Sequence, residues 1–222
     1  EQGLVPPERF IPVTEETGMI LAIGEWVLRT ACRQGKAWQD AGLPPLRMAV
    51  NLSGRQFSRP GFTDLVRDIV EQTGMPSHLL ELELTESMIM EDVDETVNRL
   101  RALKAMGVHL AIDDFGTGYS SLNYLKNFPI DRIKIAQTFV GDISNDPGDA
   151  AIVETVLAMA RGLKIEAIAE GVETEEQFAF LMSRQCTEMQ GFYFAVPLDP
   201  QDVECLVREG TVPLRKHATG RI

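Results

Sequence analysis

Residues 108–122, VHLAIDDFGTGYSSL, hold the pattern that predicts the fold of the whole chain. A short apolar, β-branched run leads into Asp113 and Asp114, and a glycine-rich turn follows. Similar runs recur along the chain between longer stretches of helical periodicity, which is typical of parallel strands joined by crossover helices. The predicted strands are residues 47–52, 79–84, 108–113, 132–136, 164–169 and 188–192.

Helices are predicted in the stretches between these strands. Gly74 and Gly107 are expected to close two of them, because glycine readily takes the left-handed conformation at a helix end. The last helix is expected to begin at Pro200 with Asp199 as its N-cap. The predicted helices are residues 14–34, 62–73, 92–106, 120–127, 149–161, 174–184 and 200–208.

The alternation of strands and helices favours an α/β fold, specifically a TIM-like (β/α) barrel. A closed barrel of this kind has eight strands and about 250 residues, with roughly 200 as a lower limit. The 222 residues show about six strand signals, so two strands are expected upstream of residue 1. We therefore expect a barrel domain over residues 1–210 that lacks its N-terminal strands, and a polar C-terminal tail at residues 211–222.

The net charge of the chain disfavours one class of partner. Acidic residues outnumber basic ones by 33 to 21, giving a formal charge of −12, so a nucleic-acid polymer is not expected to bind.

Cys32, Cys186 and Cys205 are widely separated and odd in number, which fits a reducing cytoplasm. No apolar run approaches the roughly 18 residues of a transmembrane helix. A cytoplasmic domain is expected, although its parent protein could be membrane-anchored elsewhere.

Polar groups able to bind metal, phosphate or base fall at the end of each predicted strand. In a (β/α) barrel the carboxyl ends of all strands lie on one rim, so residues distant in sequence converge in one cleft. The series is Asn51, Glu83 with Glu86, Asp113 with Asp114, Lys134, Glu170 with Glu173, and Gln190.

Carboxylates gathered in one cleft repel one another unless cations neutralise them. The donors are carboxylate and amide oxygens, which favour Mg²⁺ or Mn²⁺ over zinc. Several carboxylates suggest two ions that share a bridging ligand and promote phosphoester hydrolysis. Neighbouring strand residues point to opposite sides, so Asp113 and Asp114 can both reach the cleft only if the strand ends there. Asp113 is the better candidate for the bridge.

Each of these residues also has a simpler interpretation. Asn51 could be a turn or cap residue, and Glu83 could be paired inside the barrel or solvated at an edge. Lys134 could be a structural partner of Glu83 or Asp113. The glycines of residues 116–121 faintly suggest a dinucleotide-binding loop, but the third glycine is missing and the preceding aspartates would repel a pyrophosphate.

The order of several segments resembles one protein family. Asp113-Asp114-Phe115-Gly116-Thr117-Gly118-Tyr119-Ser120-Ser121-Leu122 is followed by Glu170-Gly171-Val172-Glu173 and Gln190-Gly191-Phe192, and preceded by Asn51-Leu52-Ser53 and Glu83-Leu84-Thr85-Glu86. These blocks resemble the signatures of the EAL family of cyclic di-GMP phosphodiesterases. Phe10-Ile11-Pro12 and Glu15-Glu16-Thr17-Gly18 resemble the block just upstream. The similarity covers roughly residues 3–200.

The resemblance implies hydrolysis of cyclic di-GMP to linear pGpG with two divalent ions, Mg²⁺ or Mn²⁺. It implies Glu170 as general base and Lys134 as the group that orients water and phosphate. The implied metal ligands are Asn51, Glu83, Asp113, Asp114 and Glu170. Implied substrate contacts are Gln190, Asn51 and Asp113, and Glu86 and Glu173 are implied to stabilise a loop. A homodimer, and fusion to sensor or diguanylate cyclase domains, are further implications.

The chain departs from the family pattern at two places. The Glu-Ala-Leu tripeptide is absent, and its glutamate is expected on a strand before residue 1. The alternative is a degenerate barrel, which is less favoured because a barrel without two strands would expose long unpaired edges. Ala136 stands where the family typically has aspartate in Lys-Ile-Asp, and alanine cannot bind metal, orient water or pair with Lys134. Reduced turnover with an intact ligand cleft is therefore expected. The alternatives to an enzyme are a cyclic di-GMP receptor without turnover and a regulatory dimerisation module.

Overall fold

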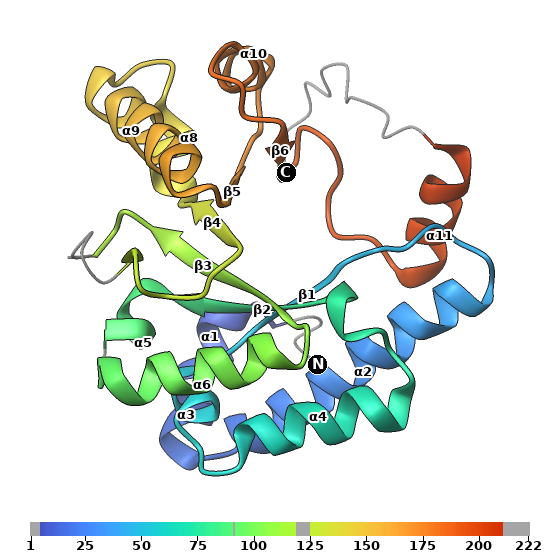
Figure 1. The fold of residues 1–222 in the computed structure, drawn as a ribbon. Helices are drawn as coiled ribbons and strands as arrows, with labels where there is room; N and C mark the ends of the chain where they lie inside the picture. The colour runs from blue at the N-terminus through green and yellow to red at the C-terminus, as the bar shows by residue number, and fades with distance from the viewer. Residues whose placement is uncertain (1–4, 91, 119–124, 211–222) are drawn as a thin grey trace.

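A computed structural model describes residues 5–90, 92–118 and 125–210. The strands form one parallel sheet in the order of the chain, β1-β2-β3-β4-β5-β6. Figure 1 shows this sheet curled, with α2, α4 and α6 along its lower side and α8, α9 and α10 along its upper side. The α/β fold with the strand order of a TIM-like barrel is confirmed.

All of the predicted strands are present, with shifted ends. The strands are β1 Met48–Asn51, β2 Leu80–Thr85, β3 His109–Phe115, β4 Arg132–Ile135, β5 Glu166–Ala169 and β6 Glu188–Met189. The largest differences are that β3 continues beyond Asp113 and that β6 is shorter than predicted. In the described residues, β1 and β6 each pair with one neighbouring strand.

The predicted helix at residues 14–34 is wrong in its boundaries, because two helices occupy this region. Gly18 has a φ of 77° and closes the first helix by donating its N–H to the Glu15 carbonyl. The second helix then runs six residues beyond the predicted end, to Asp40. The two helices are α1 Pro7–Thr17 and α2 Ile20–Asp40.

The other helices follow the prediction more closely. The long ones are α4 Phe62–Thr73, α6 Val93–Ala105, α9 Pro147–Leu163, α10 Glu175–Ser183 and α11 Pro200–Glu209. Short helices that the sequence did not predict are α3 Gly54–Phe57, the 3₁₀ helix η1 Ser77–Leu79, α5 Glu86–Met90 and α8 Gln137–Asp142. Most of the predicted helix at 120–127, and the predicted tail at 211–222, lie outside the described residues.

The hydrophobic core lies between the sheet and the helices. On β2, the outward side chains Leu80, Leu82 and Leu84 are fully buried, while Glu81 and Glu83 alternate with them and face the inside of the curled sheet. This alternation places the charged residues in the interior, where they form contacts across strands. Within the described residues, no helix combines the length and apolar composition needed to cross a bilayer.

Candidate active site

The carboxyl ends of the strands surround a cleft of about 660 Å³. All strands are parallel and in sequence order, so each strand delivers its last inward-facing residue to the same rim. The lining residues are Glu8, Ala49, Asn51, Glu83, Asp113, Lys134, Gln137, Glu170, Gly171, Glu173, Gln190, Gly191 and Phe192. Residues from each strand end in the sequence-derived series are therefore brought together.

Asp113 and Asp114 both reach the site because β3 contains a β-bulge. Ile112 pairs with Ile133 and Phe115 pairs with Ile135, so β3 holds one more residue than β4 between these pairs. Asp114 is the bulged residue and has a left-handed φ of 52°. Its N–H donates to Asp113 Oδ1 at 3.0 Å. The prediction that the strand ends at Asp113 is wrong, and the bulge is the physical reason both side chains share one side.

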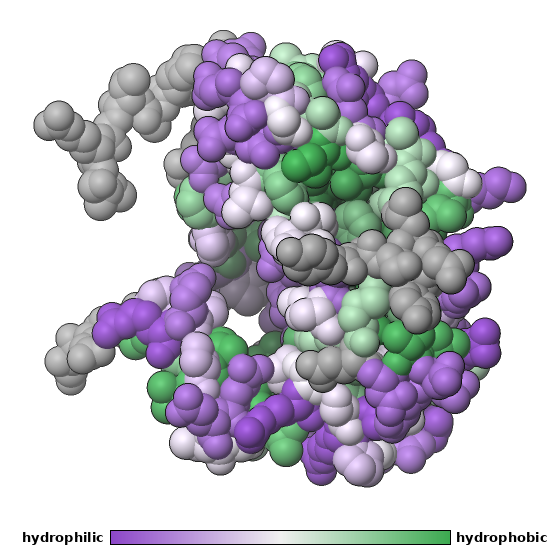
Figure 2. Space-filling model, turned by 90° about the vertical axis from the view of Figure 1, so that its left-hand side faces the viewer, coloured by the Kyte–Doolittle hydropathy of each residue, from purple (hydrophilic) through white to green (hydrophobic). Residues whose placement is uncertain are grey.

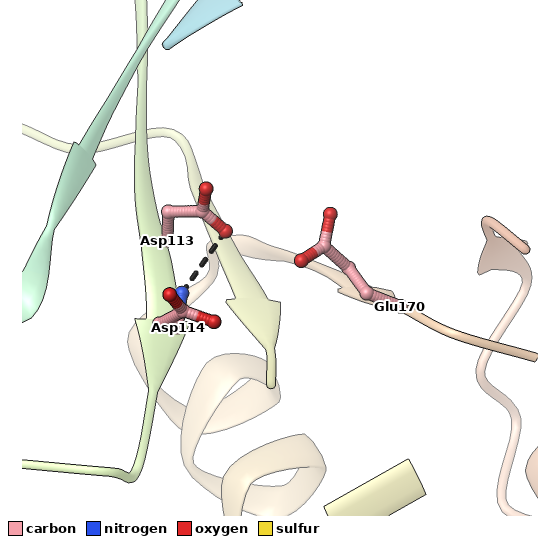
Figure 3. Close-up of side chains that lie close together, drawn as sticks. All are labelled: Asp113, Asp114 and Glu170. Atoms are coloured by element: carbon pink, nitrogen blue, oxygen red, sulfur yellow. Dashed lines mark hydrogen bonds between the residues drawn. The ribbon is translucent and has the colours of Figure 1, made fainter. Parts of the chain in front are cut away.

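Three carboxylates form a cluster suited to a metal ion. Asp113, Asp114 and Glu170 each offer an oxygen within 4.8 Å of the others (Figure 3). A divalent ion with ligand distances of about 2.1 Å bridges oxygens up to roughly 4.2 Å apart, so small side-chain rotations would complete the contacts. The donors are all oxygens, so the residues fit Mg²⁺ or Mn²⁺.

Lys134 contacts Glu83 and two carboxylates of this cluster, Asp113 and Glu170. Its Nζ is 2.7 Å from Glu83 Oε2, 3.0 Å from Asp113 Oδ1 and 2.8 Å from Glu170 Oε1. Burial alone would lower the pKa of Lys134, but the charges of Glu83 and Asp113 and the hydrogen bond to Glu170 raise it overall. The ammonium group therefore stays protonated, and Glu83, Asp113, Lys134 and Glu170 form what we call the C-terminal layer.

The carboxylates of this region hold their protons more tightly than usual. Burial raises the pKa of Glu170 to about 7, and the charges of Asp113 and Glu83 add to this rise while Lys134 opposes it. Burial also raises the pKa of Glu83 and of Asp114, the latter helped by the neighbouring charge of Asp113. One lysine does not neutralise the negative charge here, which is the condition that favours cation binding.

Asn51 and Gln190 lie on opposite sides of the cleft. Asn51 pairs in register with Glu83 across β1 and β2, and its side chain has no hydrogen-bond partner among the described residues. Gln190 continues from β6, donating its N–H to Ala169 O at 2.8 Å. Both side chains are exposed and available to a ligand.

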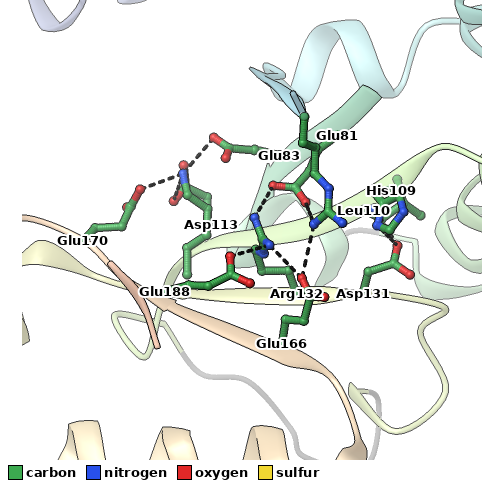
Figure 4. A network of polar contacts seen from close by, with 12 residues as sticks. Glu81, Glu83, His109, Leu110, Asp113, Asp131, Arg132, Glu166, Glu170 and Glu188 are labelled. Atoms are coloured by element: carbon green, nitrogen blue, oxygen red, sulfur yellow. Dashed lines mark hydrogen bonds and ion pairs between the residues drawn. The ribbon is translucent and has the colours of Figure 1, made fainter. Parts of the chain in front are cut away.

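A second set of ionic contacts closes the opposite end of the strands (Figure 4). Arg132 donates to Glu81 at 3.2 Å and to Glu166 and Glu188 at 2.6 Å each. Arg47 contacts Glu81 and Glu166 at 3.2 Å each. We call these residues the N-terminal layer: Arg47, Glu81, Arg132, Glu166 and Glu188.

The family assignment follows from sequence comparison. The family model described as "EAL domain" matches residues 1–197. The chain belongs to the EAL domain family. The resemblance predicted from the motif order is confirmed.

Two curated proteins resemble the chain over most of its length. It is 46% identical over 204 residues to the "Bifunctional diguanylate cyclase/cyclic di-GMP phosphodiesterase MucR" of Pseudomonas aeruginosa, covering 91% of this chain and 30% of that protein. It is 48% identical over 196 residues to an "Uncharacterized signaling protein" of Caulobacter vibrioides, covering 88% of this chain and 24% of the relative. The chain thus spans about a third or less of these relatives.

Solved EAL structures have the same fold. The structure titled "PaMucR Phosphodiesterase, c-di-GMP complex" has a TM-score of 0.89 at 44% identity, covering 91% of this chain and 82% of that one. The EAL domain of Mycobacterium smegmatis DcpA has a TM-score of 0.81 at 39% identity, covering 86% of each chain.

The two glutamates expected to stabilise a loop lie in different surroundings in this EAL domain. Glu86 is buried, and its Oε2 accepts the Gly116 N–H at 3.0 Å. A Cβ at Gly118 would lie 2.8 Å from Glu86 Oε1, so the glycine-rich turn passes directly beside this carboxylate. Glu173 is exposed beside the cleft, where its N–H donates to Gln177 Oε1 at 2.7 Å. Of the two, Glu86 is the one in contact with the glycine-rich turn.

Position 136 of this EAL domain lies at the buried N-terminal end of α8. Ala136 is 1% exposed and is the N-cap of α8, which has no side-chain cap. An aspartate there would be placed to accept from the first-turn N–H groups of α8. The alanine therefore leaves that end of α8 without the side-chain acceptor that an acidic residue would provide.

Sequence reasoning missed several residues that line the cleft, including Glu8, Gln137 and Phe192. Phe192 is 53% exposed, and its signal is an aromatic residue directly after the Gln190-Gly191 pair. Gln137 follows the end of β4, and its side chain fills the position that a Cβ at Gly171 would need, 2.2 Å from Gln137 Cγ. The N-terminal layer was also missed, because it depends on strand register rather than on a local motif.

Proposed function

We propose that this EAL domain hydrolyses cyclic di-GMP to linear pGpG. The observation that carries the proposal is the meeting of Asp113, Asp114 and Glu170 beside Lys134, at the rim of a cleft formed by parallel strand ends. The similarity to a protein named a cyclic di-GMP phosphodiesterase and to a structure titled as a c-di-GMP complex supports the choice of substrate. The signalling role follows from the same relatives.

Two divalent ions, Mg²⁺ or Mn²⁺, are part of this proposal. The residues that would hold them are Asn51, Glu83, Asp113, Asp114 and Glu170, with Asp113 shared between the ions. Bound ions would polarise the phosphoryl oxygens and favour deprotonation of the attacking water. The acidic cleft supports this requirement, because a phosphodiester anion would otherwise be repelled.

The protein's own residues divide the remaining work. Glu170, whose carboxylate lies beside Asp113 and Asp114 and 2.8 Å from Lys134 Nζ, accepts the proton of the attacking water. Lys134 donates hydrogen bonds and places positive charge beside the phosphate, where negative charge develops as the water oxygen bonds to phosphorus. The bond from phosphorus to the ribose oxygen breaks, and that oxygen leaves as a hydroxyl after taking up a proton. Asn51, Asp113 and Gln190 contact the substrate from the cleft wall.

Binding without turnover is the second candidate function, favoured by Ala136. The cleft keeps its acidic residues, but α8 begins without an acidic cap next to them. A receptor for cyclic di-GMP would need the cleft and not the full catalytic rate.

One assay separates hydrolysis from binding. The protein is incubated with cyclic di-GMP and Mn²⁺ or Mg²⁺, and pGpG is quantified by chromatography, with EDTA as the metal-free arm. The proposal expects pGpG that requires metal and disappears in Glu170→Gln. The matched control is Glu154→Gln, which removes an exposed carboxylate of α9 that pairs with Arg184. It should keep full activity. Tight binding with no product in any arm would establish the receptor instead.

A homodimer and additional domains complete the proposal. In Figure 2, hydrophobic side chains gather in the upper half of the view, where α8 and α9 lie, and Ile152 of α9 is 37% exposed. A second copy covering this face would be weakened by Ile152→Glu and not by Met182→Glu on α10, measured by sedimentation. Fusion to sensor or diguanylate cyclase domains in a cytoplasmic setting is proposed from the bifunctional relative.

A further inference from the structure

The loop that carries Asn51 into the cleft is held by hydrogen bonds that follow it in the chain. After β1 ends at Asn51, the chain continues through Leu52 to Ser53, the N-cap of α3. Leu52 donates its N–H to Glu83 O at 2.9 Å, which ties this turn to the neighbouring strand. The Asn51 side chain has no hydrogen-bond partner among the described residues, so no side-chain hydrogen bond there fixes its direction, and the backbone that carries it matters more.

A capping box fixes the backbone directly after Leu52. Gln56 Oε1 accepts from Ser53 N at 3.1 Å and from Ser53 Oγ at 3.0 Å, and Gln56 N donates to Ser53 Oγ at 3.3 Å. The box satisfies N–H groups at the start of α3 that would otherwise be unpaired. Ser53 is thereby held at φ −89° and ψ 156°, two residues from Asn51.

The Gln56 side chain occupies space that only glycine on α2 leaves open. Gln56 is 6% exposed and lies against Gly24, the fifth residue of α2. A Cβ at Gly24 would lie 1.8 Å from Gln56 Nε2 and 2.6 Å from Gln56 Oε1. These contacts are too short to exist, so any side chain at position 24 must displace the amide that makes the box.

The far end of α3 is fixed independently. Arg99 of α6 donates to the Phe57 carbonyl, and its guanidinium lies 5.8 Å from the centre of the Phe57 ring. With this end anchored, loss of the box would free the β1-side end of α3, which is the end that leads back to Asn51. The fold therefore concentrates the effect of Gln56 on the Asn51 loop.

We propose that Gln56, seated against Gly24, is a positioning residue that aims the Asn51 amide into the cleft. This rests on the proposed function, in which Asn51 is a metal ligand and substrate contact. Gln56 acts through Ser53 and the backbone, and contacts neither the metal nor the substrate. Substituting groups that orient a metal ligand typically weakens metal binding by 10–100-fold.

The test is a double-mutant cycle between Gly24→Ala and Gln56→Ala, read by Mn²⁺ binding, kcat and KM. All measurements are made at a temperature at which each variant is folded, and the melting temperature is recorded separately. We expect each single variant to bind Mn²⁺ at least about tenfold more weakly. Loss of the cap should also lower the melting temperature by roughly 2–4 °C.

The decisive result is the double variant. Gln56→Ala removes the side chain with which the Gly24→Ala methyl group would clash. Adding Gly24→Ala to the Gln56→Ala variant should therefore cause no further loss of Mn²⁺ affinity. Alanine is also the better helix former, so the added change should not lower the melting temperature. Ser53→Ala should match Gln56→Ala, and Ser53→Thr, which keeps the hydroxyl, should restore binding.

Gly162→Ala is the matched control, because a Cβ at Gly162 in α9 meets nothing within 4 Å. It should leave Mn²⁺ affinity unchanged. Additive losses in the Gly24→Ala, Gln56→Ala cycle would overturn the proposed contact. Unchanged Mn²⁺ affinity and kinetics in Gln56→Ala, with an active wild type, would overturn the positioning role alone. A wild type that neither binds Mn²⁺ nor hydrolyses cyclic di-GMP would overturn the proposed function, and this role with it.

Discussion

The N-terminal and C-terminal layers are built on the same strands and solve the problem of buried charge in opposite ways. Glu81 and Glu83 are neighbours on one face of β2, as are Arg132 and Lys134 on β4. In the N-terminal layer, Arg47 and Arg132 share their donors among the glutamates. In the C-terminal layer, Lys134 alone faces several carboxylates.

Two glutamates at opposite ends of β5, Glu166 at its first position and Glu170 directly after its last, show the result. Burial alone would raise the pKa of Glu166, but hydrogen bonds from Arg132 and Arg47 lower it. The pKa of Glu170 is instead raised to about 7, mainly by burial. The comparison teaches that the N-terminal layer has two arginines for three glutamates, whereas the C-terminal layer has one lysine for three carboxylates. The C-terminal layer is therefore shorter of positive charge, which a cation can supply.

The largest expected effect breaks the C-terminal layer. Glu170→Gln keeps the shape of the side chain but removes the proton acceptor. We expect kcat for cyclic di-GMP hydrolysis to fall about 1,000-fold, within the range for loss of a general base. Chromatographic quantification of pGpG measures this, and the folded state should persist by circular dichroism. A loss of less than tenfold would contradict the role given to Glu170.

The next effect breaks the N-terminal layer. Arg132→Met leaves Glu81, which is 1% exposed, with Arg47 as its remaining partner in the layer. Removing one partner from a buried ionic contact should lower the free energy of unfolding by about 3 kcal/mol, measured by urea denaturation. Arg184→Met breaks the exposed pair with Glu154 and should cost less than about 1 kcal/mol. Equal losses in the two variants would show that the N-terminal layer is not a support.

A smaller effect is expected in the pH dependence of the free energy of unfolding of metal-free protein, to which the two layers contribute with opposite sign. The folded protein keeps the Glu170 proton up to about pH 7, whereas an unperturbed glutamate releases it near 4.5. The unfolded state therefore gains relative stability as pH rises across this window, and the free energy of unfolding falls, on the order of 2 kcal/mol. Glu166 acts in the opposite sense, because its lowered pKa stabilises the fold above pH 4.5 and this contribution is lost as pH falls further.

Urea denaturation from pH 3 to 8 in EDTA tests this contrast. Glu170→Gln should flatten the profile between about pH 4.5 and 7, and Glu166→Gln should flatten it below pH 4.5. Saturating Mn²⁺ should reverse the fall toward pH 7, because metal and protons compete for the same oxygens. The contrast is lost if both variants change the same pH window.

The smallest effect sharpens the comparison by adding an acid beside the C-terminal layer. Ala136→Asp supplies the missing N-cap of α8 and returns an acidic group to that rim. We expect turnover to rise several-fold, measured as the initial rate of pGpG formation, while Ala136→Asn, which caps the helix without the charge, should raise stability alone. No change in turnover for Ala136→Asp would make the alanine incidental.

The sequence predicted the rim of the site better than the details that complete it. Asn51, Glu83, Asp113, Lys134 and Glu170 could be recognised because parallel strands must present their carboxyl ends together. The register of the strands could not be read from local patterns, so the N-terminal layer was missed. The bulge at Asp114 was missed for a related reason, because an aspartate in the left-handed region has no reliable local signature.

Helix boundaries show the same limit. Gly18 marked the end of α1, but the continuous apolar periodicity on both sides of it favoured one helix. The role of Gly24 could not be predicted at all, because it depends on Gln56, which lies more than thirty residues away in sequence yet occupies the space beside it.

The single extra residue in β3 makes catalysis and folding separable in evolution. Deleting Asp114 would leave Phe115 directly after Asp113, on the outward face that it already occupies in the core, and the strand would regain regular pairing with β4. A deletion variant that keeps its melting temperature but no longer binds Mn²⁺ would demonstrate this. One lost codon could therefore turn such an enzyme into a stable, inactive relative, and a gene duplicate could reach that state without passing through an unfolded intermediate.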